Sequence, residues 1–173
     1  MNDFNVFIFA ILKGAGRVQI YDCIFIPGRD MYAYCASDHT IGICREHISL
    51  SGSKVTYSLY NKIFHGLLHV KLCYSAKAKT LCTLASTNVV YGWELEGSMP
   101  LFNISRHSDL VTDFIAIDEL ELFASCSMDK RIVIWSSITR RVKGVFIGHK
   151  RGIRSLSYSK NLMLSGKLLF PPF

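Results

Sequence analysis

Short runs of β-branched and other apolar residues alternate with Gly, Ser, Asn and Asp along most of the chain. The clearest stretch predicts four strands, at 110–117, 122–127, 131–136 and 141–147. A tight turn at 128–130 would join the second strand to the third, and Asp129 suits it because an Asp side chain can bond its own local backbone. Four short strands in about 42 residues is the size of one β-propeller blade.

A spacing of 42 residues recurs through the second half of the chain. It separates His107 from His149 and Trp93 from Trp135, and it brings His65 under His107. The apolar run that ends at each tryptophan falls at the same place in both copies. A shared period of this length indicates repeated supersecondary units.

A weaker copy of the unit lies nearer the N-terminus. At a shift of 91 residues, Asp22 falls under Asp113 and Asp38 under Asp129, while Cys44 occupies the place of the tryptophan. This shift is seven residues longer than two periods, so the first unit carries an insertion after Cys44. The insertion predicts either an enlarged loop or a longer outer hairpin.

The repeat covers the chain as one region, 1–173, without a domain boundary. Units are expected at 17–64, 65–106 and 107–148, with a truncated fourth unit at 149–166. Residues 1–16 are predicted to hold an outer strand of a preceding blade, and 167–173 a tail outside the repeat. Pro171 and Pro172 in that tail lack the N–H groups that a central strand requires.

Two segments of the third unit carry a resemblance to a known family. Residues 123–135 resemble the second strand, turn and third strand of a WD40 repeat, and the pair 148–149 resembles its Gly-His step. The resemblance implies an all-β fold, a WD40-type β-propeller fragment whose consecutive four-stranded antiparallel blades form an open arc. It also implies one hydrogen-bonded set, made of His107, Ser127, Asp129 and Trp135.

Such a set has a physical purpose, because a buried indole N–H needs an acceptor and a buried histidine needs a partner that fixes its tautomer. A hydrolase is the alternative for a Ser, His and Asp trio, but no nucleophile turn surrounds Ser127. The second unit has Ala85 and Thr87 where the set has Ser and Asp, so its network is expected to be absent. His47 and His69 have no partner in the pattern and are expected on surfaces or loops.

Composition narrows the compartment and the chemistry. The six cysteines show neither a C-x-x-C pair nor zinc-like spacing, which favours small buried side chains in a reducing compartment, with disulfides or metal sites as the alternative. The apolar run 4–12 is too short to span a bilayer and lacks the positive start of a signal peptide. A cytoplasmic protein is expected. The run 148–159 resembles large ciliary WD-repeat proteins, which adds the cilium or cytoskeleton as an alternative location.

The sequence contains no phosphate loop, paired-carboxylate site or metal cluster, so we expect neither an enzyme nor a cofactor. The WD40 resemblance implies a scaffold that binds other proteins or peptides. In that family, one face of the ring holds the turns between the second and third strands and the loops that lead into the first strand. On this chain that face would carry Ser86, Asn88, Arg106, Ser108, Asp109, Met128, Lys130, Lys150 and Arg151.

Three further interpretations stay open. The net charge is +7, and six basic residues lie between 140 and 154, which favours binding to nucleic acid or to a phosphoinositide membrane. The segment 139–142 departs from the Phe-Arg-Arg-Gly motif of phosphoinositide-binding propellers. A second interpretation is that the chain is a remnant of a longer scaffold without a function of its own. Open blade edges also predict self-association.

Overall fold

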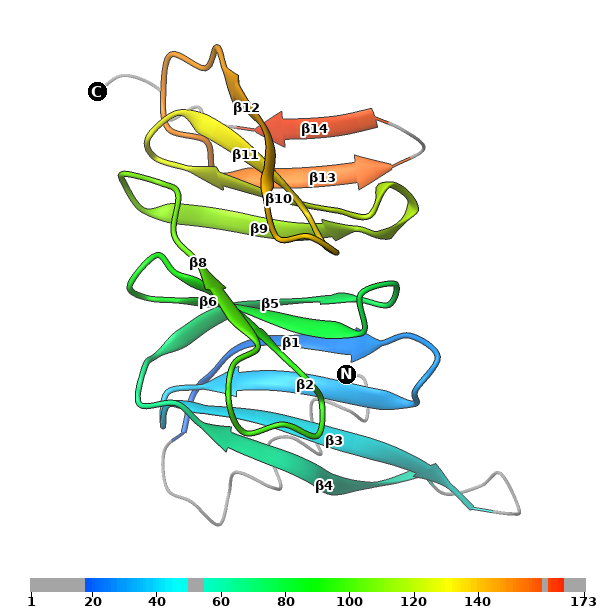
Figure 1. The fold of residues 1–173 in the computed structure, drawn as a ribbon. Helices are drawn as coiled ribbons and strands as arrows, with labels where there is room; N and C mark the ends of the chain where they lie inside the picture. Colours follow the sequence, from blue (N-terminus) through cyan, green and yellow to red (C-terminus); the bar gives the residue numbers. More distant parts are fainter. Residues whose placement is uncertain (1–17, 50–54, 160–161, 167–173) are drawn as a thin grey trace.

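The structure, a computed structural model, describes residues 18–49, 55–159 and 162–166. Three sheets have four antiparallel strands each, paired in chain order (Figure 1). The first contains β1 (Ile20–Ile26), β2 (Met31–Ala36), β3 (Thr40–Ile48) and β4 (Val55–Phe64). The second contains β5 (His69–Ser75), β6 (Thr80–Ala85), β7 (Val90–Trp93) and β8 (Phe102–Ile104). The third contains β9 (Val111–Ile117), β10 (Leu122–Ser127), β11 (Arg131–Ser136) and β12 (Val142–Ile147).

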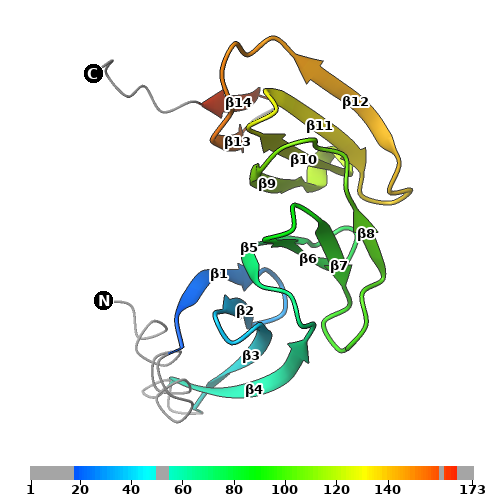
Figure 2. The same cartoon turned by 90° about the vertical axis from the view of Figure 1, so that its left-hand side faces the viewer.

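A two-stranded sheet of β13 (Ser155–Ser159) and β14 (Leu162–Gly166) follows, and the short 3-10 turn Asp118–Leu120 joins β9 to β10. The sheets stand side by side as blades in an arc, with β1, β5, β9 and β13 along its inner side (Figure 2). The predicted all-β fold of consecutive four-stranded blades in an open arc is confirmed. The expected strand at 1–16 and the tail at 167–173 lie outside the described residues.

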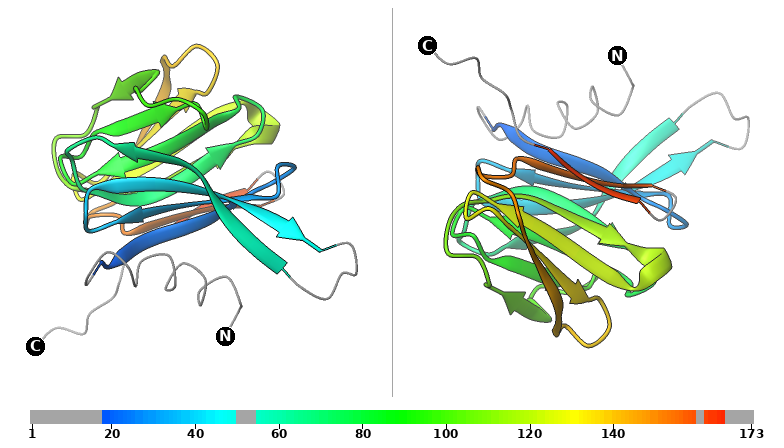
Figure 3. Two further views of the ribbon diagram at one scale, coloured as in Figure 1. Left: turned by 90° about the horizontal axis from the view of Figure 1, so that it is seen from below. Right: turned by 90° about the horizontal axis from the view of Figure 1, so that it is seen from above.

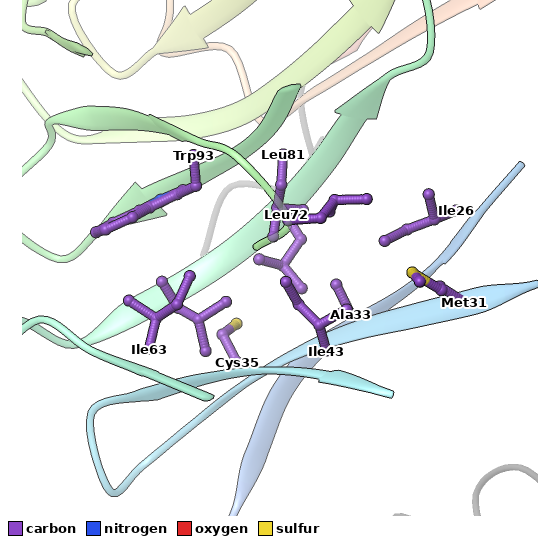
Figure 4. Close-up of a cluster of buried hydrophobic side chains, with 11 residues drawn as sticks. Ile26, Met31, Ala33, Cys35, Ile43, Ile63, Leu72, Leu81 and Trp93 are labelled. Carbon is purple, nitrogen blue, oxygen red and sulfur yellow. The ribbon is translucent and has the colours of Figure 1, made fainter. Parts of the chain in front are cut away.

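The blades are held together by apolar side chains that face the neighbouring blade. Figure 4 shows the contact between blades 1 and 2, where Ile43 and Ile63 approach Leu72, Leu81 and Trp93. Comparable clusters fill the contacts between blades 2 and 3 and between blade 3 and the β13–β14 sheet. The second strand of each blade is almost wholly buried. In blades 2 and 3, its two faces contact the two neighbouring sheets. Stability in such an arrangement comes from each blade and its nearest neighbours.

Aspartates on the inner strands, half-buried at Asp22 and buried at Asp113, add a polar link at the same repeat position. The carboxylate of Asp22 accepts a hydrogen bond from the backbone N–H of Leu72 on β5, at 2.8 Å. Asp113 accepts one from Leu156 on β13, also at 2.8 Å. The second blade has Lys71 at this position, and its Nζ lies 2.6 Å from Asp113 Oδ1. Each blade is therefore linked to the next by a charged side chain of an inner strand.

The insertion in the first unit lengthens the outer hairpin. Strands β3 and β4 pair from Thr40 and Phe64 out to Ile48 and Val55, with one register shift at Ile43. The hairpin projects beyond the other strands of its blade (Figure 3). Of the two predicted forms, the longer outer hairpin is the one observed. Within the described residues, no helix is long and apolar enough to cross a membrane.

Candidate interaction surface

The nine residues of the predicted face lie on turns and loops at one end of the blades. Strands within a blade are antiparallel, so the second turn of each blade and the loop that enters the next blade emerge at the same end. Two turns and two loops supply the face. They are the β6–β7 turn with Ser86 and Asn88, the β8–β9 loop with Arg106, Ser108 and Asp109, the β10–β11 turn with Met128 and Lys130, and the β12–β13 loop with Lys150 and Arg151.

Hydrogen bonds join these turns and loops across the blades. Asn88 accepts a hydrogen bond from the N–H of Val111, 3.2 Å away at the start of β9. The carbonyl of Ser127 accepts one from the N–H of Ile153 at 3.1 Å. Met128 lies against Gly152 so closely that a Cβ there would be 2.6 Å from the methionine sulfur. The structure thus places the turns and loops that carry the predicted residues next to one another at one end of the blades.

A buried network in blade 3 supports this surface. His107 Nδ1 lies 2.9 Å from Asp129 Oδ2, and their side chains are only 1% and 4% exposed. The same carboxylate accepts hydrogen bonds from the N–H of Ser108 at 3.1 Å and from the N–H and Nη2 of Arg131, each at 3.0 Å. Asp129 therefore holds the β8–β9 loop against the β10–β11 turn.

The hydroxyl partner of His107 is Ser125, not the predicted Ser127. Ser125 Oγ lies 2.5 Å from His107 Nε2. Ser127 Oγ donates to the carbonyl of Asp109 at 3.0 Å and accepts from the N–H of Asp129 at 3.0 Å. The two serines are two residues apart on β10 and lie on the same side of the strand. The imidazole of His107 reaches Ser125, which is farther from the β10–β11 turn than Ser127. The predicted bond from the Trp135 indole is also missing, since its N–H has no acceptor among the described residues.

The Ser125, His107 and Asp129 contacts have the connectivity of a hydrolase triad, so accessibility decides their role. Ser125 lies on a strand in the middle of the blade and is fully buried. A substrate carbonyl cannot approach a hydroxyl enclosed on both faces of a sheet. The arrangement positions loops and satisfies buried polar groups, and it offers no accessible nucleophile.

Blade 2 contains a network that the sequence did not predict. Trp93 Nε1 donates to Thr83 Oγ1 at 2.9 Å, and Thr83 Oγ1 lies 2.9 Å from His69 Nδ1. His69 Nε2 is in turn 3.2 Å from His65 Nδ1. The expectation that His69 lies on a surface or loop is wrong, because it is 1% exposed at the start of β5. The other histidine, His47, is exposed as expected.

One feature of the sequence would have predicted which hydroxyl side chains contact the histidines. Thr83 and Ser125 are 42 residues apart, so both units have a hydroxyl side chain at the same repeat position. In blade 3 this hydroxyl meets His107 directly, whereas in blade 2 His69 stands between the hydroxyl and His65. His69 thus takes the place of the missing aspartate as the partner of His65 Nδ1.

Burial and hydrogen bonding shift the pKa values of His65, His69 and Asp129. Burial lowers the pKa of His69 to about 4, and the neighbouring His65 and His39 add to this effect. Burial also lowers the pKa of His65. For Asp129, burial raises the pKa, but the hydrogen bonds from His107, Arg131 and Ser108 outweigh it and bring the pKa down to about 2. The blade 2 imidazoles are therefore neutral, and Asp129 is ionised, at neutral pH.

Acid should weaken the protein in two separate steps. The pKa of His69 is about 4 when folded and 6.5 ordinarily, so the unfolded chain takes up the proton first as the pH falls. Stability is fully present above pH 6.5 and falls by about 3 kcal/mol as the pH drops through 4. Asp129 adds a loss at lower pH, between 3.8 and about 2.

Urea unfolding measured from pH 7 to pH 4.5 tests the first step. We expect the His69→Gln variant to lose most of the pH dependence in this range, although it is less stable at pH 7. The control is His47→Gln, since His47 is exposed and bonds Ser58 at 2.7 Å. A wild-type free energy of unfolding that stays constant from pH 6.5 to 4.5 would contradict the buried neutral His69.

The two tryptophans give a second prediction. Trp93→Phe breaks a buried hydrogen bond and leaves Thr83 short of a donor, whereas Trp135→Phe removes an indole N–H that has no acceptor among the described residues. Both substitutions remove the same volume from fully packed sites. We expect Trp93→Phe to cost about 1–2 kcal/mol more in urea unfolding than Trp135→Phe. Equal losses would show that the two indoles are bonded alike.

The described residues contain no group of three His, Cys, Asp or Glu side chains placed to hold a metal ion. All six cysteines are free thiols. Burial is the main cause that raises the pKa of Cys23 and Cys35 to about 12, so both remain protonated and weakly nucleophilic.

Comparisons with known proteins agree with this geometry. Residues 98–136 match the family model for the WD domain, G-beta repeat (WD40). A stretch of 76 residues, 44% of this chain, is 29% identical to cilia- and flagella-associated protein 337 B of Tetrahymena thermophila and covers 6% of it. Over 162 residues, 91% of this chain, it is 23% identical to an uncharacterized WD repeat-containing protein of Schizosaccharomyces pombe and covers 42% of it.

Solved structures share the fold. U3-55K and the RRP9 WD40 repeats each superpose with a TM-score of 0.64 over 81% of this chain and 42% of theirs, at 16% identity. The fold is that of a WD40-type β-propeller fragment, and the predicted resemblance to the WD40 repeat family is confirmed. The chain spans less than half the length of the curated relatives that it matches.

Proposed function

We propose that this chain is a non-catalytic scaffold that binds other proteins or peptides through the surface of the nine residues described above. The observation that carries the proposal is the contrast between the base and the outer side of this surface. Its base is fixed by the buried Asp129 network, while Arg106, Lys130, Lys150 and Arg151 are exposed on the outer side. A partner therefore meets side chains on loops that are already ordered, which lowers the entropic cost of binding.

The WD40 match supports this class of function, because propellers of this family are generally interaction scaffolds. The surface has four cations around one acidic residue, Asp109, so a partner with carboxylates complements it better than a basic one. Aliphatic side chains are scarce on it. Charge and hydrogen bonding, rather than a large apolar patch, would select the partner.

An affinity capture with the whole chain tests the proposal. The variant Lys130→Glu with Lys150→Glu reverses two charges on the surface, and Arg29→Glu with Lys79→Glu makes the same charge change on other blades. We expect partners identified by mass spectrometry to be lost with the first variant and retained with the second. A folded wild-type chain that captures nothing beyond what the surface variant captures would overturn the proposal.

A second candidate function is binding to an acidic surface, either nucleic acid or a phosphoinositide membrane, through 140–154. The observation in its favour is that Arg140, Arg141, Lys143, Lys150, Arg151 and Arg154 are all exposed. Binding to RNA or anionic liposomes that weakens steeply with added salt would support this function. Protein capture that is insensitive to salt would favour the scaffold.

We propose a cytoplasmic location for this scaffold, with the cilium as a specific site. The relative named as cilia- and flagella-associated in Tetrahymena supports the ciliary site. Fluorescence imaging of the tagged full-length gene product in ciliated cells tests it. Exclusion of the signal from cilia would remove the ciliary part of the proposal.

A further inference from the structure

The charges of this chain are distributed unevenly. The segment 130–173 contains ten lysines and arginines and neither Asp nor Glu, whereas 1–129 contains ten basic and 13 acidic residues. The basic segment includes the two outer strands of blade 3 and the β13–β14 sheet. The net charge of +7 is thus concentrated on one part of the arc.

Strand β12 is the edge of its sheet and lies along the outer rim of the arc (Figure 2). Among the described residues, it pairs with β11 alone, so its outer row of backbone groups is open. Its apolar side chains are open too, since Val145, Phe146 and Ile147 are 46%, 57% and 80% exposed. An exposed strand edge with apolar side chains is a template for another strand.

The corresponding strand of blade 2 shows what a covered edge strand looks like. On β8, Ile104 is 8% exposed, and Phe102 is half-buried beneath the guanidinium of Arg140, 4.6 Å from its ring centre. No described residue covers β12 in this way, because five of its six residues are exposed. The apolar row on β12 therefore differs from the covered outer strand of the neighbouring blade.

Basic side chains flank β12 at both ends. Arg141 and Lys143 lie at its start, and Lys150 and Arg151 follow its end. Two carboxylates of the same blade near these ends already have partners. Glu121 pairs with Lys77 of blade 2 at 2.9 Å, and Asp129 is held by His107 and Arg131. The positive charge at the two ends is thus left for a partner to neutralise.

We propose that β12 binds an extended acidic peptide as an additional strand of blade 3. The peptide has apolar residues in its middle, against Val145 and Ile147, and carboxylates towards both ends, where the basic residues lie. The six residues of β12 span roughly 20 Å, so the pairing segment has a similar length. This inference rests on the proposed function. It names a docking site on β12 that adjoins the nine-residue surface at Lys150 and Arg151, and it names the chemistry of the partner.

The open backbone edge favours a peptide over the other anionic partners. Nucleic acid and lipid headgroups would use the cations but not the row of N–H and C=O groups. Strand addition uses both, because main-chain hydrogen bonds give affinity and alternate side chains give specificity. The register shift between Ile134 and Trp135 adds twist at the start of β12 and leaves 144–147 as the regular part of the edge.

Selection from a random octapeptide library with the whole folded chain tests the proposal. We expect enriched peptides to have apolar residues at the centre and Asp or Glu near both ends. A synthetic peptide of the enriched sequence should bind Arg141→Glu with Lys143→Glu at least roughly tenfold more weakly. The control Arg29→Glu with Lys79→Glu carries the same charge change and should bind like the wild type.

Amide hydrogen exchange of the complex distinguishes strand addition from charge attraction alone. Saturating peptide should slow exchange within 142–147 at least roughly tenfold and leave β4, the outer strand of blade 1, unchanged. Unchanged exchange in β12, an absence of enriched peptides, or enrichment of peptides without acidic residues would overturn the proposal. Binding of phosphatidylserine vesicles or RNA with no enriched peptide would overturn it as well.

The two sites can fail separately. If partners depend on Lys130 and Lys150 but no peptide is selected, the inference about β12 is wrong and the proposed function stands. If a peptide binds β12 while the Lys130→Glu, Lys150→Glu variant captures the same partners as the wild type, the proposal about the nine-residue surface is wrong.

Discussion

Replacing Asp129 with alanine should lower the free energy of unfolding by about 3 kcal/mol. The carboxylate is 4% exposed and serves donors from His107, Ser108 and Arg131. Its removal leaves a buried imidazole and two backbone N–H groups without their acceptor. A buried donor that is left without an acceptor lowers the free energy of unfolding by more than its hydrogen bond had contributed.

The control for this prediction is Thr87→Ala, at the corresponding turn position of blade 2. Thr87 is exposed, and we expect its removal to change stability by less than about 0.5 kcal/mol. Urea unfolding of both variants at pH 7 gives the comparison. In a double-mutant cycle, His107→Ala should cost much less in the Asp129→Ala background than in the wild type. Equal losses at Asp129 and Thr87, or additive effects in the cycle, would show that the carboxylate does not hold the network.

The blade architecture could be predicted because its signals are local and periodic. The four predicted strands of the third unit differ from β9 to β12 by at most one residue at either end. Each blade buries alternating apolar residues between turns, and the 42-residue period aligns these features. The contact of His107 with Asp129 was implied by the resemblance to the WD40 repeat, in which the two residues belong to one hydrogen-bonded set.

The inner partners could not be predicted because they depend on depth within the blade. Ser125 and Ser127 share one side of β10, and periodicity alone does not say which of them an imidazole reaches. In blade 2, the sequence shows the loss of an aspartate but not its replacement by His69, which comes from the adjoining strand β5. The loss of the aspartate at one repeat position is compensated by His69 at a different repeat position, and only the three-dimensional structure shows this contact.

The 173-residue chain, purified alone, should self-associate. At one end of the arc, β14 pairs only with β13 among the described residues, and Leu164 on it is 58% exposed. At the other end, Tyr21 and Phe25 on β1 are 41% and 48% exposed. Unpaired strand edges with apolar side chains recruit other chains, whereas a closed ring of blades protects its edges.

Light scattering coupled to size-exclusion chromatography measures this association. We expect a mass of at least two chains at micromolar concentration, and a shift towards the monomer in the Leu164→Lys variant, because a charge on an edge strand opposes pairing. The control Leu120→Lys places the same charge on the 3-10 turn Asp118–Leu120, outside any strand edge, where Leu120 is 51% exposed, and should leave the mass unchanged. A wild-type monomer of 19.5 kDa with one cooperative thermal transition would contradict the prediction, because it would require both ends of the arc to be satisfied within a single chain.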